Sequence, residues 1–166
     1  VENKQILFLP DRNLGSYIAE FFPEKEFIFW QGFCPTHERI SVEDILTAKE
    51  KHPQVKVLAH PECNKEVRDL CDYIGSTSGI IDFATKCEDE EFIICTEEGI
   101  LYELKKKNPD KNFYIPGGSI SCVDMKKTTL NNLYDTLLNM KNEVILDESV
   151  SKNALKCLEN MHSLAK

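Results

Sequence analysis

The chain alternates short runs of apolar residues with stretches in which apolar residues recur every three or four positions. The runs contain few polar residues, which is typical of strands that are covered on both faces of a parallel sheet. Strands that alternate with helices form βαβ units, so the pattern predicts an α/β fold. The expected strands lie at 6–9, 27–30, 55–59, 92–95, 112–115 and 144–146, with a shorter one at 73–74.

Capping residues mark the expected helix starts between these runs. Ser41, with Asp44 three positions later, resembles a capping box and predicts a helix that reaches about Lys51. Asn64 is expected to cap a helix that carries Val67, Leu70 and Cys71, and Ser78 is expected to cap one over 79–85. Two apolar stripes predict helices near the end of the chain, one with Leu130, Leu133, Leu137 and Leu138, the other with Val150, Ala154, Leu158 and Met161.

One segment of the chain repeats another. Four residues recur 86 positions later and a cysteine recurs 88 positions later, so that Pro23, Lys25, Phe27, Gly32 and Cys34 match Pro109, Lys111, Phe113, Gly118 and Cys122. Each copy reads strand, polar turn, helix, strand, Gly and Cys, which indicates an architecture of repeated units. Each unit therefore ends with a thiol at the carboxyl edge of its strands, where open α/β sheets bind ligands.

Two thiols in equivalent places of two related units are expected to converge on the axis that relates them. Two cysteines do not complete a usual metal site. We therefore expect a third unit upstream of this chain, ending in a third cysteine.

Composition narrows the classes of partner. The 166 residues are 42% hydrophobic and carry a net charge of −8, so the chain can bury a core but is a poor match for nucleic acid or an anionic membrane surface. It has no run of 18 apolar residues and no signal-peptide pattern, and we expect a cytoplasmic protein. The seven cysteines are scattered rather than gathered in a small framework, which favours reduced or metal-binding thiols over disulfides.

Polar residues that follow the expected strands are candidates for a pocket. His60 and Glu62 follow the run at 55–59 and could bind substrate and move protons, although a plain polar turn is slightly favoured by the residues alone. Ser76 and Thr77 follow Gly75 and could bind a carboxylate or phosphate, although helix capping is the commoner role. Lesser candidates are His37, Thr96, Glu97, Lys126 and Lys127.

Two rival interpretations come from the same residues. Cys34-x2-His37 and His60-x2-Cys63 together make a ligand set that is adequate for tetrahedral zinc. A metal-free module that binds small anions is the other alternative. We interpret the remaining cysteines as structural, with Cys71 and Cys157 on apolar helix faces, Cys95 in a strand, and Cys63 and Cys87 in turns.

Six segments, in order, resemble successive motifs of the quinolinate synthase family. They are PDRNLGSYIA, GFCPTHERI, HPEC, GSTSGIIDF, TEEGILYEL and SCVDMKKTTL, and the resemblance runs essentially from end to end of the chain. The resemblance implies three similar α/β/α domains, with short parallel sheets, around a pseudo-threefold axis. On that basis residues 1–34 are the second half of the middle domain and 35–122 the complete third domain. Residues 123–166 are C-terminal helices and a strand that pack back on the domains.

The resemblance also implies chemistry. The family holds a [4Fe-4S] cluster by one cysteine from each domain, leaving one iron open, so Cys34 and Cys122 would be two ligands, with the third cysteine upstream. His60 and Glu62 would act in catalysis and substrate binding, and Ser76 and Thr77 would bind carboxylates. The family condenses iminoaspartate with dihydroxyacetone phosphate to form quinolinate for NAD biosynthesis, with L-aspartate oxidase as a functional partner. The chain alone is expected to be inactive.

Overall fold

The structure is a computed structural model, and it describes residues 2–164. The contacts divide the chain into two compact units, one of residues 3–123 and the other holding the C-terminal segment from Asp124 onward. All the residues that the sequence singles out for chemistry, apart from Lys126 and Lys127, belong to the first unit.

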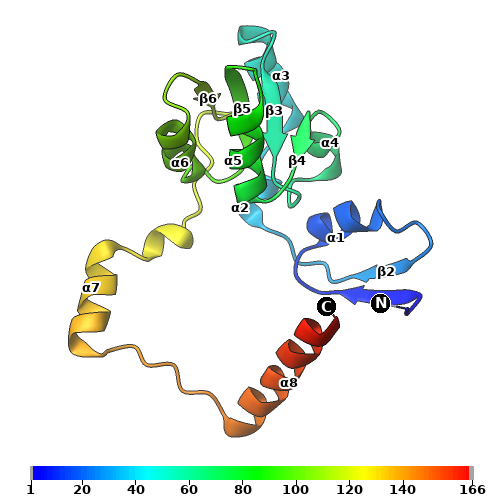
Figure 1. The fold of residues 1–166 in the computed structure, drawn as a ribbon, viewed down its shortest axis with the longest axis vertical. Coiled ribbons are helices and arrows are strands. Elements are labelled where there is room, and N and C mark those ends of the chain that lie inside the picture. The colour runs from blue at the N-terminus through cyan, green and yellow to red at the C-terminus, as the bar shows by residue number, and fades with distance from the viewer. Residues whose placement is uncertain (1, 165–166) are drawn as a thin grey trace. The chain divides into compact units, whose positions relative to one another are not determined.

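The first unit begins with a two-stranded parallel sheet. Strands β1 (Gln5–Phe8) and β2 (Glu26–Phe29) are joined by helix α1 (Arg12–Ala19), as Figure 1 shows in blue. Both expected strands are confirmed, each starting one residue earlier than the apolar run. The expected boundary after residue 34 follows this sheet and stays a prediction.

A four-stranded parallel sheet forms the rest of the unit. It consists of β3 (Lys56–Ala59), β4 (Tyr73–Ile74), β5 (Glu91–Cys95) and β6 (Asn112–Tyr114), in the order β4-β3-β5-β6. The helices that precede and connect these strands are α2 (Pro35–Glu38), α3 (Val42–Lys51), α4 (Lys65–Arg68), α5 (Thr77–Lys86) and α6 (Ile100–Lys107). The predicted α/β class with short parallel sheets is confirmed.

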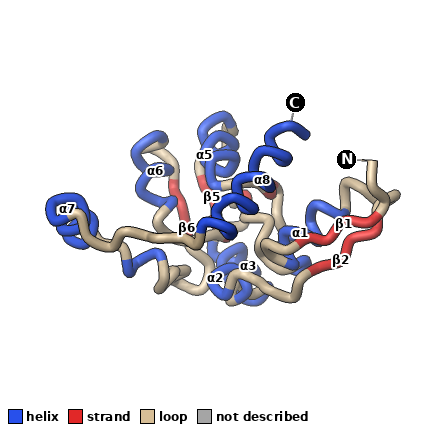
Figure 2. Tube along the Cα trace, turned by 90° about the horizontal axis from the view of Figure 1, so that it is seen from below, coloured by secondary structure: helices blue, strands red, loops and turns tan. Residues whose placement is uncertain are grey.

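Helices cover both faces of this sheet, and Figure 2 shows α5 and α6 on the side of the strands opposite to α3. Alternate strand residues face opposite sides, and they divide the core into two clusters. One cluster packs Val57, Ala59 and Ile93 against Ile45 of α3 and Val67 of α4; the other packs Leu58, Phe92 and Ile94 against Ile80 of α5 and Leu104 of α6. The result is a three-layer α/β/α arrangement.

The strand order creates a switch point between β3 and β5. The chain leaves β3 toward β4 on one side of the sheet, and it leaves β5 toward β6 on the other. In open α/β sheets the crevice at the carboxyl ends of two such strands is the usual ligand site. His60 directly follows β3 and Thr96 directly follows β5, so both lie at this crevice.

The internal repeat is visible in the backbone. Gln5 pairs with Glu26 in the first sheet, and the residues 86 positions later, Glu91 and Asn112, pair in the second. Helices α1 and α6, which follow β1 and β5, are each eight residues long. The predicted repeat is confirmed as two β-α-β units with the same register.

Two of the predicted helices differ in their ends. The start predicted at Ser78 is wrong, because Ser76 has the extended backbone of an N-cap and its hydroxyl accepts from the N–H of Gly79. Helix α4 is capped by Asn64 as predicted but ends at Arg68, so that Cys71 lies after it. The chain turns there because β4 must pair with β3 only five residues later.

The C-terminal unit contains the two helices predicted from apolar stripes, α7 (Leu130–Asn139) and α8 (Glu148–Leu164), after a short 3-10 turn at Met125–Lys127. The predicted strand at 144–146 is wrong, since these residues are exposed and irregular. A three-residue run forms a strand only when a neighbouring strand pairs with it, and no described residue does so here. Among residues 2–164, no helix has the length and apolar character needed to cross a membrane.

Candidate functional site

Cys34 lies between β2 and α2, and the carboxylate of Asp11 fixes its backbone. The Cys34 N–H donates to Asp11 Oδ2 at 2.8 Å. The other oxygen, Oδ1, accepts from the N–H groups of Asn13 and Leu14 at 2.8 and 2.9 Å, which caps α1. The buried carboxylate of Asp11 therefore ties Cys34 to the start of α1.

Cys122 is held in the same way by Glu97. Its N–H donates to Glu97 Oε1 at 3.3 Å, and Glu97 Oε2 accepts from the N–H of Gly99 at 2.7 Å, just before α6. Glu97 lies 86 positions after Asp11, the offset of the repeat. The two cysteines are thus equivalent in hydrogen bonding as well as in sequence.

A backbone hydrogen bond completes each of the two loops. The N–H of Arg12 donates to the carbonyl oxygen of Gly32, and the N–H of Glu98 donates to that of Ile120, both at 2.8 Å. Each acceptor lies two residues before its cysteine, so the chain enters both cysteines along the same path.

The loops that carry Cys34 and Cys122 lie at one edge of the compact unit of residues 3–123 and not on its opposite faces. Arg39, at the end of α2, donates from Nη2 to the carbonyl oxygen of Ser121 at 2.9 Å. The segment after Cys34 therefore contacts the residue before Cys122. Neither cysteine forms a disulfide, and both are half-buried. Their joint role as metal ligands stays a prediction.

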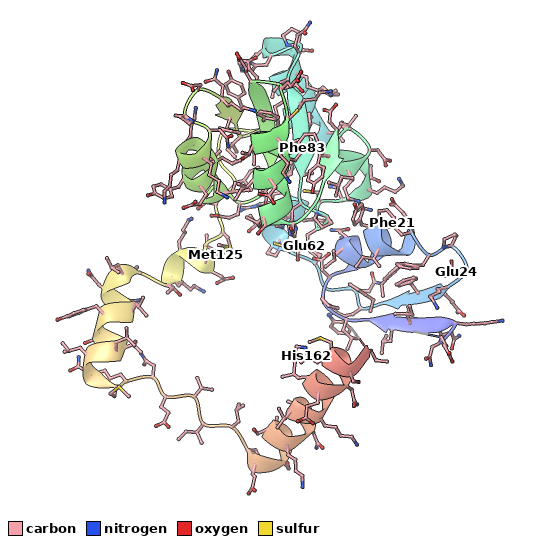
Figure 3. The ribbon with its side chains drawn as sticks, viewed as in Figure 1. Phe21, Glu24, Glu62, Phe83, Met125 and His162 are labelled. Carbon is pink, nitrogen blue, oxygen red and sulfur yellow. The ribbon has the colours of Figure 1, made fainter. Side chains whose placement is uncertain are left out.

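A cluster of titratable groups adjoins Cys34. His37 lies one turn further along α2, and its Nδ1 is 3.0 Å from Glu62 Oε2. The rings of His37 and His60 stack with centroids 4.7 Å apart. The Cys34 thiol lies within hydrogen-bonding reach of Glu62. Figure 3 shows Glu62 beside α2 at the edge of the unit.

Two of these groups have shifted pKa values. The pKa of Glu62 is lowered, chiefly by its contact with His37, although partial burial opposes the shift. The carboxylate is therefore ionised at neutral pH and can accept a proton. The pKa of His60 is lowered by burial and then by the neighbouring His37. His60 is therefore neutral at pH 7, and because its Nδ1 accepts from the Glu62 N–H at 3.3 Å, the ring proton is on Nε2.

The loop after β5 supports His37 from the other side. Nε2 of His37 is 2.9 Å from Thr96 Oγ1, and both residues are buried. His37, Thr96 and Glu97 were minor candidates from the sequence, yet the structure brings all three to the cysteine loops. The lysine candidates differ, because Lys126 and Lys127 belong to the C-terminal unit.

Ser76 and Thr77 lie at the start of α5, where the chain leaves the carboxyl end of β4. Both are exposed. The Ser76 hydroxyl accepts from the Gly79 N–H at 3.2 Å, so it performs the capping role that the sequence also allowed. The structure places the pair at the same sheet edge as His60, which follows the adjacent strand β3.

The rival zinc set of Cys34, His37, His60 and Cys63 is not brought together. Cys63 is fully buried in the core, its thiol donates to the Cys95 carbonyl oxygen at 3.3 Å, and burial raises its pKa well above the usual value. Within residues 2–164 the group that could hold a metal ion is instead Cys34, His37 and Glu62, whose ligand atoms lie within 4.8 Å of one another.

The other cysteines have structural positions. The pKa of the buried Cys95 thiol is raised by its hydrogen bond with Cys71 and by burial. Cys71 donates to the Val67 carbonyl oxygen from beyond the end of α4, and not from a helix face as predicted. Cys87 donates to Asp89, and Cys157 is exposed on α8.

Sequence reasoning missed two residues that shape the site. The signal for Asp11 was present, because the repeat aligns it with Glu97, but the change of residue type concealed the match. Arg68 gave no signal. It is buried, and its Nη1 donates to the carbonyl oxygens of Cys63 and Asn13 at 2.7 and 3.2 Å. The guanidinium thereby joins α1 to the turn that carries His60 and Glu62.

Comparisons with known proteins identify the family to which the chain belongs. A family model described as quinolinate synthetase A protein matches residues 1–163. Quinolinate synthase of Clostridioides difficile (strain 630) is 62% identical over 165 residues, which cover 99% of this chain and 54% of the relative. That of Clostridium perfringens (strain SM101) is 52% identical over 164 residues, with the same coverage.

A third relative, quinolinate synthase of Caldicellulosiruptor saccharolyticus, is 51% identical over 163 residues, or 98% of this chain and 54% of its own length. The chain thus spans about half the length of the relatives it matches. The family model covers nearly all of the chain, and the identities extend from end to end. The resemblance inferred from the sequence motifs is therefore confirmed, and the chain belongs to the quinolinate synthetase A protein family.

Proposed function

We propose that this chain provides two cluster ligands and part of the substrate pocket of a quinolinate synthase. The whole enzyme would condense iminoaspartate with dihydroxyacetone phosphate to form quinolinate for NAD biosynthesis. The observation that carries the proposal is the equivalence of Cys34 and Cys122, whose backbone N–H groups donate to carboxylates 86 positions apart. Two thiols placed alike at one edge are expected when both bind a single group on the repeat axis.

The residues present fit an iron–sulfur cluster. Cys34 and Cys122 are half-buried thiols that form no disulfide, and thiolate sulfur is the ligand that such clusters prefer. The third cysteine would come from the part of the relatives that this chain does not span. When bound, a [4Fe-4S] cluster with one iron free of protein ligands supplies a Lewis acid for substrate oxygen atoms.

The chain's own residues supply the proton transfers. Glu62 is the base, because its contact with His37 keeps it ionised at neutral pH. His60 is neutral, with its proton on Nε2, and it would donate a hydrogen bond from that atom to a substrate oxygen. Glu62 and His60 follow β3 at the switch point of the sheet, where a substrate can reach both.

Ser76 and Thr77 would bind a substrate carboxylate. They lie at the start of α5, a ten-residue helix whose first N–H groups and dipole attract an anion. L-aspartate oxidase is the functional partner that would supply iminoaspartate, and a cytoplasmic location stays a prediction.

The test is single replacement of each cysteine in the intact protein. Cys34→Ser and Cys122→Ser should each lose iron, sulfide and the broad visible absorbance of the cluster, together with quinolinate formation. Cys157→Ser is the matched control, because its thiol is exposed on α8, and it should retain all of these. A Cys34 or Cys122 variant that keeps the cluster absorbance would refute the proposal.

A further inference from the structure

We propose that Cys34, His37 and Glu62 form a second kind of metal site, one that binds a single Zn²⁺ or Co²⁺ ion in protein that lacks the cluster. Their ligand atoms, one thiol sulfur, one imidazole nitrogen and one carboxylate oxygen, lie within 4.8 Å of one another. The three residues come from two segments, since Cys34 is the N-cap of α2, His37 lies within α2, and Glu62 follows β3.

His37 provides the observation that points to a ligand. Its side chain is only 9% exposed, and its Nδ1 is buried without a hydrogen-bond partner. Glu62 Oε2, the nearest carboxylate oxygen, is 3.0 Å away. A buried imidazole nitrogen beside a thiol and a carboxylate is suited to bind a metal ion.

The other nitrogen of His37 already has the partner that a metal-binding histidine requires. Nε2 lies 2.9 Å from Thr96 Oγ1. In the metal-bound form Nε2–H would donate to this hydroxyl, which leaves the Nδ1 lone pair for the metal and fixes the orientation of the ring. Histidine ligands in metalloproteins almost always donate their second N–H in this way.

The spacing suits a small tetrahedral ion. Two ligand atoms at 2.0–2.1 Å from zinc lie about 3.3 Å apart at the tetrahedral angle. His37 Nδ1 and Glu62 Oε2 are 3.0 Å apart, close to this spacing, and the Cys34 sulfur lies within 4.8 Å of both. The thiolate and the carboxylate together carry two negative charges, which match a divalent cation.

The donor types select the class of metal. Sulfur and imidazole ligands favour Zn²⁺ and its spectroscopic substitute Co²⁺ over Mg²⁺ or Ca²⁺, which prefer oxygen. Three protein ligands leave the fourth position open to water. The site differs from the zinc set that the sequence suggested, because Glu62 takes the place of His60 and the buried Cys63.

One consequence rests on the proposed function. If Cys34 is a cluster ligand, the same sulfur cannot serve both metals. Zinc bound at Cys34, His37 and Glu62 would then exclude the cluster, and chelation of the zinc would be needed before the cluster could be assembled.

Titration of the reduced, metal-free chain with Co²⁺ under anaerobic conditions tests the site. We expect one ion per chain, a thiolate-to-cobalt charge-transfer band, visible bands with the intensity of tetrahedral coordination, and displacement of the cobalt by one equivalent of Zn²⁺. Cys34→Ser should remove the charge-transfer band, and Glu62→Gln should weaken binding by more than about 100-fold. Thr96→Val should weaken it by about 10- to 100-fold through loss of the His37 orientation.

Cys122→Ser is the control that separates the two metal sites. It should leave cobalt binding unchanged in the chain while it abolishes the cluster in the intact enzyme. Circular dichroism and thermal unfolding of each variant identify any that fail to fold. Cobalt that requires Cys122, or that binds to the folded chain without a thiolate band, would overturn the mononuclear site without affecting the proposed function. Absence of stoichiometric cobalt binding to the folded wild-type chain would overturn it as well.

Discussion

Asp11 and Glu97 hold two cysteine loops by the same pair of interactions, although they differ in side-chain length and lie 86 positions apart. Each uses one carboxylate oxygen for the N–H of the residue two positions on and the other for the N–H of the cysteine. A carboxylate can do this because it only accepts, and from both oxygens. The backbone of Cys34 is therefore fixed relative to α1, and that of Cys122 relative to α6.

Neutral amides at these two positions should loosen the cysteine loops. In Asp11→Asn or Glu97→Gln the side chain keeps one acceptor oxygen, and its NH₂ group then faces a backbone N–H that has no acceptor. Hydrogen bonds to charged groups contribute about 1.5–3 kcal/mol, so we expect the free energy of unfolding to fall by about that amount. In the intact protein both variants should also lose cluster iron faster on exposure to a chelator.

Glu98→Gln is the matched control for this pair. Its carboxylate accepts from Ser119 Oγ at the surface, so the change should alter neither the unfolding free energy nor iron loss. Chemical denaturation measures the first and release of iron to a coloured chelator measures the second. Asp11→Asn with wild-type values of both would show that the carboxylate does not hold the Cys34 loop.

His60 should make the protein less stable as the pH falls through the mildly acidic range. Its folded-state pKa is lowered from the usual 6.5 by burial and by His37. Below pH 6.5 the unfolded chain therefore binds the proton more readily, and stability is lost progressively until the pH reaches the folded-state pKa. His60→Asn keeps an acceptor for the Glu62 N–H but does not titrate, so the difference in unfolding free energy between the two proteins should change across this range. If the difference in unfolding free energy between the wild type and His60→Asn is constant from pH 7.5 to 5, the lowered pKa of His60 is contradicted.

Arg68 should be among the most important residues for stability in the first unit. Its guanidinium is buried and donates to backbone carbonyl oxygens on both sides, and it pairs with Glu20 at 3.2 Å. Arg68→Met leaves those oxygens without a donor, and loss of one partner of such a buried network costs about 3–5 kcal/mol. Denaturation by urea measures the loss. The control is Lys65→Met, which removes an exposed cation from the same helix, and its unfolding should match that of the wild type.

The fold followed largely from the apolar pattern, because strands covered on both faces must be apolar throughout. The runs at 92–95 and 112–115 became β5 and β6 within one residue at each end. The wrong predictions of secondary structure came at positions where the local pattern of apolar and capping residues does not determine the structure. The run at 144–146 has no strand to pair with among the described residues, and Ser76 and Ser78 are equally good caps in sequence, so that only the backbone geometry of Ser76 decides between them.

The candidate site was harder to predict than the fold. The repeat placed Cys34 and Cys122 correctly at equivalent positions, because spaced identities survive in the sequence. The role of His37 could not be read in the same way, since its neighbours Glu62 and Thr96 come from loops after β3 and β5. Contacts between loops depend on strand order, and the order β4-β3-β5-β6 is not encoded in any local pattern.

Glu62→Gln should separate chemistry from cluster binding. The amide keeps the size of the side chain but cannot accept a proton, and loss of a general base typically lowers turnover by about 10²–10⁴-fold. Since Glu62 is not among the proposed cluster ligands, iron, sulfide and visible absorbance of the intact enzyme should stay at wild-type levels. Steady-state quinolinate formation together with iron analysis measures both quantities on one sample.

Glu62→Gln should also change how the free energy of unfolding depends on pH, and this tests the contact between Glu62 and His37 without any substrate. The pKa of Glu62 is lowered from 4.5 in the folded chain, so its ionised form stabilises the wild type above pH 4.5, and this contribution is lost as the pH falls through the folded-state value. Glu62→Gln should remove that dependence, whereas Glu66→Gln, a change on the exposed side of α4, should preserve it. If turnover falls but the acid dependence of unfolding is unchanged, Glu62 acts on the substrate without the contact to His37 that keeps it ionised.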